Sequence, residues 1–242
     1  MQILDDEEGN TDSAVTDRDA LTINIEITKL LKKMPPRPVT DVLIQHFFSE
    51  ANWIYEMVYF TTFTERYNAW WAGPCQSVAD LQFAALLLRL CSYTAQFLPS
   101  QNYTADTILG NPLSALREQC NATAISLTRV SMMEEGLPSI TRIHEHFFHA
   151  CYLKNEGSMK ESWDVLGKAI HDAHELGLHI ESRKYGGRTV SEYEIEMGKR
   201  TYWNLWLWDK YVITLFITSS PFFYLHYTLQ EPFIAGDNNR RP

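Results

Sequence analysis

The chain has 242 residues, of which 45% are hydrophobic, 13% aromatic and 21% charged. This composition can bury a sizeable core and excludes a disordered chain, and 11 Gly and 10 Pro are too few for collagen-like or low-complexity sequence. The net charge is −9, from 21 Lys and Arg against 30 Asp and Glu, and no basic stripe is present that could neutralise nucleic-acid phosphates. We therefore expect one globular domain, or part of a larger protein, that does not itself bind DNA.

The cysteines and the N-terminus indicate the compartment. The four cysteines form no CxxC pair and have no histidine at zinc-finger spacing, so we expect them to be buried, reduced side chains: Cys75, Cys91, Cys120 and Cys151. The first residues lack the basic and apolar regions of a secretory signal. These features favour the cytosol or the nucleus.

Residues 1–20 carry seven acids and one base. They include no aromatic residue, and no leucine occurs between Asp5 and Ala20, so an acidic transcriptional activation segment is less favoured than a plain acidic tail. We expect residues 1–20 to be a disordered acidic tail.

From Leu21 the hydrophobic pattern is helical. Residues 21–27 also alternate like a strand, but the Lys- and Leu-rich run after them favours a helix, which the prolines at 35, 36 and 38 should end. A second helix is expected to start near Thr40 and to bury Leu43, Phe47 and Ala51. Short helical turns are expected over 52–76, followed by helices over 77–98, 111–130 and 139–153.

Two capping boxes mark the last two helices. Ser158 with Glu161, and Ser191 with Glu194, match the pattern in which a serine hydroxyl and a glutamate carboxylate satisfy the first N–H groups of a helix. Gly177 should end the first of these helices in the left-handed conformation. The sequence thus predicts an all-α fold, an irregular array of several helices without a confident strand.

Trp163 and Trp203 are predicted to be core residues. Trp163 lies on an apolar helical stripe with Leu166 and Ile170, and Trp203 lies in an aromatic helix. If both are mostly buried, replacing either by alanine should cost roughly 3–5 kcal/mol.

Histidines supply the sequence motifs that most resemble a catalytic or metal-binding site. His144 and His149 flank a stretch that resembles a helical zinc site, but five residues place them about 140° apart around a helix, whereas the HExxH spacing of four places its ligands about 40° apart. His171 and His174 could share a metal with Asp172 or Glu175 and a third group from elsewhere, which leaves a metal-dependent enzyme or a helical ligand-binding protein as an alternative. Histidines at the polar edges of helices are the favoured interpretation. No phosphate-binding glycine loop or GxSxG motif occurs, so we predict no catalytic residue and no metal site.

Three blocks, in order over residues 30–212, resemble the fungal-specific transcription factor domain, the middle homology region of binuclear zinc cluster regulators. The first runs from Leu31 to Trp71 and ends in the paired Trp70 and Trp71. The second contains Trp163 and ends in Leu176, Gly177, Leu178 and His179. The third contains Glu196, Arg200, Trp203 and Asp209.

This resemblance implies a nuclear regulator of RNA polymerase II transcription in which a helical region controls activity. It implies a possible small-molecule effector and possible co-regulators or a homodimer as partners. DNA would be bound only through an N-terminal cluster of six cysteines that holds zinc, and this chain has no cysteine before Cys75. We therefore expect no cofactor in this chain, no enzymatic activity, and a regulatory domain truncated at both ends, with a non-functional fragment as a further alternative.

Residues 213–230 depart from the family pattern, because they separate Tyr211 and Val212 from a later Glu231–Pro232 turn. We interpret 213–230 as an apolar insertion, possibly a translated intron, between a regulatory domain over 21–212 and its partial continuation over 231–242. A transcript sequenced across this junction tests the hypothesis, and a spliced message that still encodes residues 213–230 would contradict it. A membrane helix over residues 212–229 is the less favoured alternative, because its Thr, Ser, Pro and His residues make a weak span.

Overall fold

The computed structural model describes residues 23–73, 75, 77–98, 107–133, 138–180, 184–185, 188–189 and 191–219. Helices dominate this part of the chain, which confirms the all-α prediction. Residues 23–31 are helical, and the other main helices are α2 (Arg37–His46), α3 (Asn52–Tyr55), α4 (Phe60–Ala72), α5 (Val78–Thr94), α6 (Leu113–Met133), α7 (Ile140–Asn155), α8 (Met159–Glu175) and α9 (Glu192–Ser219). A π-helical turn, Phe47–Ala51, links α2 to α3, and a 3-10 turn, Ala95–Phe97, follows α5.

Two very small antiparallel hairpins accompany the helices. Strands β1 (Thr107–Ile108) and β2 (Asn111–Pro112) pair with Thr107 opposite Pro112, and β3 (Lys184–Tyr185) and β4 (Arg188–Thr189) pair with Lys184 opposite Thr189. Each strand has two residues, so neither hairpin contributes a sheet to the core.

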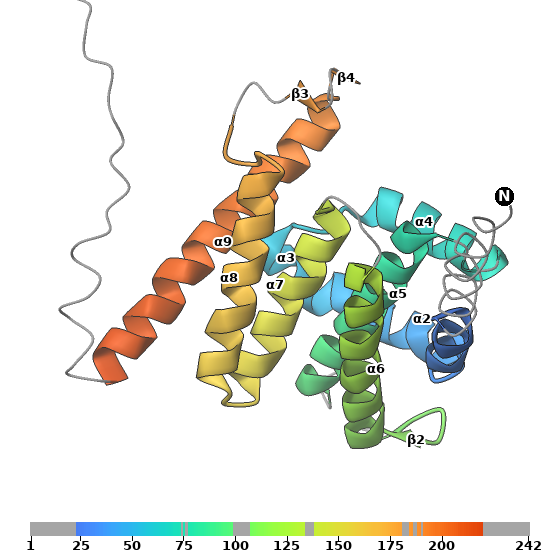
Figure 1. Ribbon diagram of the computed structural model, residues 1–242. Helices are drawn as coiled ribbons and strands as arrows, with labels where there is room; N and C mark the ends of the chain where they lie inside the picture. The colour runs from blue at the N-terminus through green and yellow to red at the C-terminus, as the bar shows by residue number, and fades with distance from the viewer. Residues whose placement is uncertain are drawn as a thin grey trace, which may run out of the picture.

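Helix α5 lies at the centre of the fold. All of its residues from Leu81 to Thr94 are buried, because α6 and α7 pack extensively against it and α2 packs against another side. A helix that is apolar on every side is typical of such a position. Figure 1 shows α7, α8 and α9 side by side on one flank, and the α7–α8 and α8–α9 pairs are in direct contact.

Most predicted helix boundaries are confirmed, and three local predictions are wrong. Helix α2 begins at Arg37, three residues early, because Pro38 fits the first helical turn, where a missing N–H costs nothing. The 52–76 region holds the 13-residue helix α4 as well as short turns. Ser158 forms no cap hydrogen bond, because its backbone (φ −83°, ψ 65°) lies outside the extended region that an N-cap requires.

The Ser191–Glu194 box forms as the sequence indicates, and a second serine box is present at the start of α5. Ser77 and Asp80 cap α5 reciprocally, and at α9 the Glu194 N–H donates to Ser191 Oγ (3.2 Å) while Ser191 N–H donates to Glu194 Oε2 (2.9 Å). These local contacts fix where the two helices begin.

The remaining domain predictions concern residues that are only partly described. Residues 1–20 and 231–242 lie outside the described residues, as do 220–230. Helix α9 continues without a break from Val212 to Ser219, so the backbone has no boundary at the start of the predicted insertion. Among the described helices, none is long and apolar enough to cross a membrane.

Candidate functional site

A cavity of about 600 Å³ lies where α4, α5, α7, the turn after α8 and α9 meet. Its wall is mostly apolar and is formed by side chains from these elements and from the turn before α4: Met57, Val58, Phe63, Phe83, Leu86, Ile140, Leu176, Leu178 and Met197. A largely apolar cavity of this size with a few polar groups is typical of a small-molecule site.

Both charged side chains of the wall already have polar partners. Arg66 Nη2 lies 2.5 Å from Asp80 Oδ1, and the Arg66 guanidinium also lies 5.6 Å from the centre of the Phe83 ring. The Glu194 carboxylate accepts hydrogen bonds from Ser191 at the start of α9. Neither charge therefore needs a ligand to satisfy it.

His144 contributes a neutral polar group to the wall. Its Nε2 atom lies 2.8 Å from Thr201 Oγ1 of α9, and the side chain is buried. Burial lowers the pKa of His144 to about 4, because the charged imidazolium would lose its hydration. At neutral pH the ring is uncharged and links α7 to α9 through one hydrogen bond.

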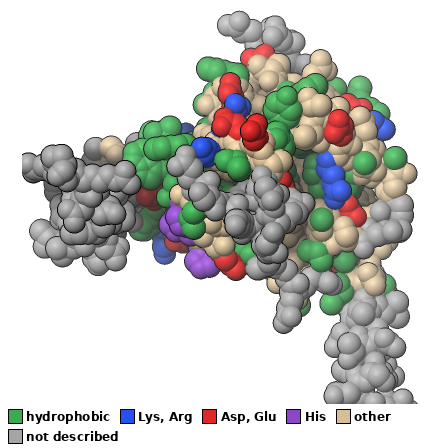
Figure 2. Space-filling view, turned by 90° about the horizontal axis from the view of Figure 1, so that it is seen from above, with side chains coloured by type: hydrophobic (Ala, Val, Ile, Leu, Met, Phe, Trp, Pro, Cys, Tyr) green, Lys and Arg blue, Asp and Glu red, His purple; other side chains and the backbone are tan. Residues whose placement is uncertain are grey.

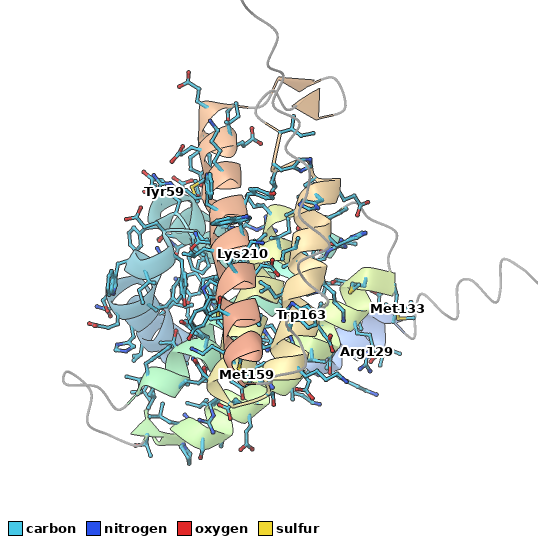
Figure 3. The ribbon with its side chains drawn as sticks, turned by 90° about the vertical axis from the view of Figure 1, so that its left-hand side faces the viewer. Tyr59, Arg129, Met133, Met159, Trp163 and Lys210 are labelled. Atoms are coloured by element: carbon cyan, nitrogen blue, oxygen red, sulfur yellow. The ribbon has the colours of Figure 1, made fainter. Side chains whose placement is uncertain are left out.

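Two tyrosines lie at the edge of the cavity. The rings of Tyr59 and Tyr193 are 5.5 Å apart, and the Tyr193 hydroxyl lies 2.7 Å from Thr62 Oγ1. Both tyrosines are more than two-fifths exposed, so this contact is at the surface. Figure 3 shows Tyr59 on one side of α9 and Trp163 on the other. The tyrosine contact joins the beginning of α4 to the beginning of α9.

The Leu-Gly-Leu-His turn after α8 supplies part of the cavity wall. Gly177 has φ +65°, and the N–H groups of Gly177 and Leu178 donate to the carbonyls of His174 and Ala173, which is a Schellman cap. This cap directs Leu176 and Leu178 into the cavity, where both are buried. His179 is exposed, and its ring packs against His174 and Tyr202.

Replacing Gly177 by alanine should destabilise the domain by about 1 kcal/mol, because a Cβ atom makes the left-handed conformation unfavourable. Chemical denaturation followed by circular dichroism measures this loss. Gly167→Ala is the matched control, since Gly167 is inside α8 and a Cβ there meets no atom within 4 Å. Equal stability of the Gly177→Ala variant and the wild type would contradict the cap.

Other residues of the family motif lie outside the cavity wall. The Trp163 side chain forms a hydrogen bond with Asp209, which joins α8 to α9. Arg200 pairs with Glu196 (2.8 Å) on its own helix and with Glu56 (3.3 Å) just beyond α3. Trp70 and Trp71 make an edge contact with each other at the end of α4, away from the cavity wall.

The prediction that Trp203 is a core residue is wrong. Trp203 is 63% exposed and contacts Trp206. It lines two surface grooves between α9 and neighbouring segments, whereas Leu205 and Val212 are buried. The fully buried positions of α9 are therefore held by smaller side chains, and the partly buried Trp208 packs against Tyr55 and Phe147. Trp163, by contrast, is half-buried and packs against the core, which agrees with its predicted stripe.

Replacing Trp203 by alanine should change the free energy of unfolding by less than about 1 kcal/mol, because little buried area is lost. Trp163→Ala should cost clearly more, through lost packing and the lost bond to Asp209. Urea denaturation of both variants checks the order, and a larger loss for Trp203→Ala would contradict the packing seen here.

The histidine predictions have mixed outcomes. His144 and His149 point to different surroundings, as the spacing predicts: His144 bonds α9, and His149 interacts with the Arg89 and Glu145 charges. His144 and His146 are buried, so they do not lie at polar edges of helices as we expected.

The alternative metal site does not assemble as predicted. The ring of His174 contacts those of His179 and Tyr202, whereas His171 groups with Asp172 and Glu175 within 4.8 Å. Both Asp172 oxygens accept hydrogen bonds from Arg142, at 2.7 and 2.9 Å, which weakens Asp172 as a metal ligand. The described geometry therefore does not favour the enzyme alternative.

A buried polar network between α5, α6 and α7 was missed by the sequence interpretation. Arg89 Nε and Nη2 donate to Glu145 Oε1 at 2.9 and 2.8 Å, and Arg89 also bonds Asn121 of α6. Arg89 is fully buried and Glu145 is 2% exposed. A single arginine inside the apolar run of α5 is the signal that could have revealed this network.

Comparison with known proteins assigns the chain to a family. A family model for the fungal specific transcription factor domain matches residues 44–233, which include the whole described cavity. The chain is 38% identical over 185 residues to the probable transcription factor sol4 of Alternaria solani, and 30% identical over 187 residues to the transcription factor xilB of Penicillium rubens.

These alignments cover 76% and 75% of this chain but only 33% and 28% of the relatives, so the chain spans about a third of their length. No solved structure matches significantly. The family match covers well over half of the chain and agrees with the all-α structure. The chain therefore belongs to the fungal specific transcription factor domain family.

Proposed function

We propose that this chain is the regulatory, non-DNA-contacting domain of a fungal transcription factor and that a small effector in the cavity controls it. The observation that carries the proposal is the position of the cavity within the family match, with two residues of the family motif, Leu176 and Leu178, in its wall. Both relatives are named as transcription factors.

The cavity suggests how an effector could act. Its wall joins α4, α7 and α9, which are otherwise linked there by the Tyr59–Tyr193 and His144–Thr201 contacts. An effector that binds this arrangement of the three helices more tightly than another arrangement would shift the population toward it. The exposed face of α9 would then bind co-regulators, or a second copy of the chain, with a different affinity.

DNA contact and zinc belong, in this proposal, to a part of the protein outside this chain. The chain has a net charge of −9 and no cysteine before Cys75. On the face that Figure 2 shows, Lys and Arg side chains are scattered among acidic and hydrophobic ones. We propose a nuclear location and regulation of RNA polymerase II transcription, without an enzymatic activity, on the basis of the family.

A reporter assay tests the proposal. The 242-residue chain is placed between a heterologous DNA-binding domain and an activation domain in a fungal host, and reporter output is compared with that of the same fusion without the chain. We expect the chain to change reporter output. We expect Thr141→Trp, which fills the cavity from α7, to alter that effect, whereas Thr28→Trp on an exposed helical surface should not. Equal output from fusions with and without the chain would contradict a regulatory role.

A further inference from the structure

We infer that the cavity selects a neutral, predominantly apolar, ring-containing small molecule over charged molecules of the same shape. This inference rests on the proposed effector function and adds the chemical class of the ligand. It is carried by the paired charges, the aromatic side chains and the few neutral polar groups of the wall.

The first step is the absence of an available counter-charge in the described wall. Arg66 already pairs with Asp80, and Glu194 accepts hydrogen bonds from Ser191. A charged ligand would lose its hydration on entry, and the two charged side chains of the described wall are already engaged by other groups. A neutral ligand avoids that cost.

The second step concerns the start of α7, which supplies Ser139, Ile140 and Thr141 to the wall. A helix N-terminus attracts anions. Here the Ser139 hydroxyl accepts from the Arg142 N–H and donates to Gln82 Oε1 (2.6 Å), and the carboxylate of Glu194 lies in the same wall. The carboxylate repels an anion, which offsets the attraction of the helix end.

The third step is the shape of the apolar wall. Phe63 and Phe83 lie with ring centres 5.4 Å apart, and Tyr59 and Tyr193 present two more rings at the edge. Aromatic side chains favour stacked or edge contacts with another ring, in addition to simple burial of area. The volume of about 600 Å³ is in the range that holds a whole small molecule.

The fourth step concerns the neutral hydrogen-bonding groups of the wall. Thr62 and Tyr193 bond each other at the edge, and His144, which is neutral, bonds Thr201 inside. Hydroxyl and imidazole groups can exchange these bonds for a bond to a neutral hydroxyl or carbonyl of a ligand. A neutral molecule with one such group thus satisfies both the apolar and the polar parts of the wall.

Three probes with one ring system and different charges test this inference. The 242-residue chain is dialysed to equilibrium against 1-pyrenemethanol, 1-pyrenecarboxylate or 1-pyrenemethylammonium, and bound probe is measured by its fluorescence. We expect the neutral alcohol to bind at least tenfold more tightly than either ion. Equal or tighter binding of an ion would overturn the neutral class while leaving an effector-controlled domain intact.

Cavity variants show whether the probe binds at this site. Thr141→Trp, and Thr62→Trp as a second variant at an exposed position of the edge, should each weaken binding of the alcohol at least tenfold. Thr28→Trp, which lies outside the wall, should leave it unchanged. Circular dichroism verifies that each variant keeps its helices. Failure of all three probes to bind, or binding that both cavity variants retain, would overturn the ligand site, whereas the reporter assay tests the regulatory function separately.

Discussion

Replacing Glu145 by alanine should lower the free energy of unfolding by about 3–5 kcal/mol, because the Arg89 guanidinium would remain buried without its carboxylate. Arg89 lies on the central helix α5, where α6 and α7 exclude water. Asn121 would still accept one hydrogen bond from Arg89, but an amide oxygen carries no charge to balance the guanidinium. Urea denaturation followed by circular dichroism measures the loss.

A double variant separates the cost of an unpaired charge from the worth of the pair. Arg89→Met with Glu145→Met removes both charges and fills the space with apolar side chains, so it should be clearly more stable than Glu145→Ala. Glu156→Ala, which removes the partly exposed Arg117–Glu156 pair (3.5 Å), should cost less than about 1 kcal/mol. A double variant as unstable as the single one would contradict this account of the buried pair.

Lowering the pH from 7 to 5 should destabilise the domain by about 4 kcal/mol through His144 and His149. Burial lowers the pKa of His144 to about 4, and burial together with the Arg89 charge lowers that of His149 to about 3, while both are near 6.5 in the unfolded chain. Between pH 6.5 and 4 the unfolded state thus binds protons that the folded state does not. Stability therefore rises with pH across this window, by about 2 kcal/mol per histidine between pH 5 and 7.

Urea denaturation at pH 7, 6 and 5 checks this dependence in three proteins. His144→Gln should lose about half of the pH dependence, because one depressed pKa is removed and Thr201 keeps a hydrogen-bonding partner. His171→Gln is the matched control, since the His171 side chain is 79% exposed, and its slope should equal that of the wild type. The same slope in His144→Gln as in the wild type would show that the His144 pKa is not depressed.

Local features of the fold could be predicted from sequence because they depend on neighbouring residues. Helix periodicity, the Ser77–Asp80 and Ser191–Glu194 caps, and the left-handed Gly177 need no distant partner. The predicted Ser158 cap is absent because Ser158 follows a tight turn in which Gly157 has φ +81°. The backbone of Ser158 is therefore not extended, and its side chain does not reach the first N–H groups of the helix. The length of α4 was missed for a similar reason. Asn52 holds the 56–58 turn by bonding the N–H and carbonyl of Val58, and this allows a full helix to follow.

In the candidate site, too, motif residues could be predicted from sequence, whereas their spatial arrangement could not. The Leu176 and Leu178 positions came from the family motif, but their place in a cavity wall depends on α4, α7 and α9, which are distant in sequence. Tyr59, Arg66 and Tyr193 carry no motif of their own and were not predicted. They matter here only because tertiary packing brings α4 beside the start of α9.

The helical class, most helix boundaries and the family follow from the sequence alone, because periodicity, caps and each motif block involve residues close together in the chain. Contacts between helices that are distant in sequence set which aromatic side chains of α9 are buried, which charges pair inside the core and where a cavity remains. Trp203 illustrates the reason. Hydrophobicity favours its burial, but the inward face of α9 is set by packing against α7 and α8, and that face carries Leu205, Val212 and the partly buried Trp208 instead.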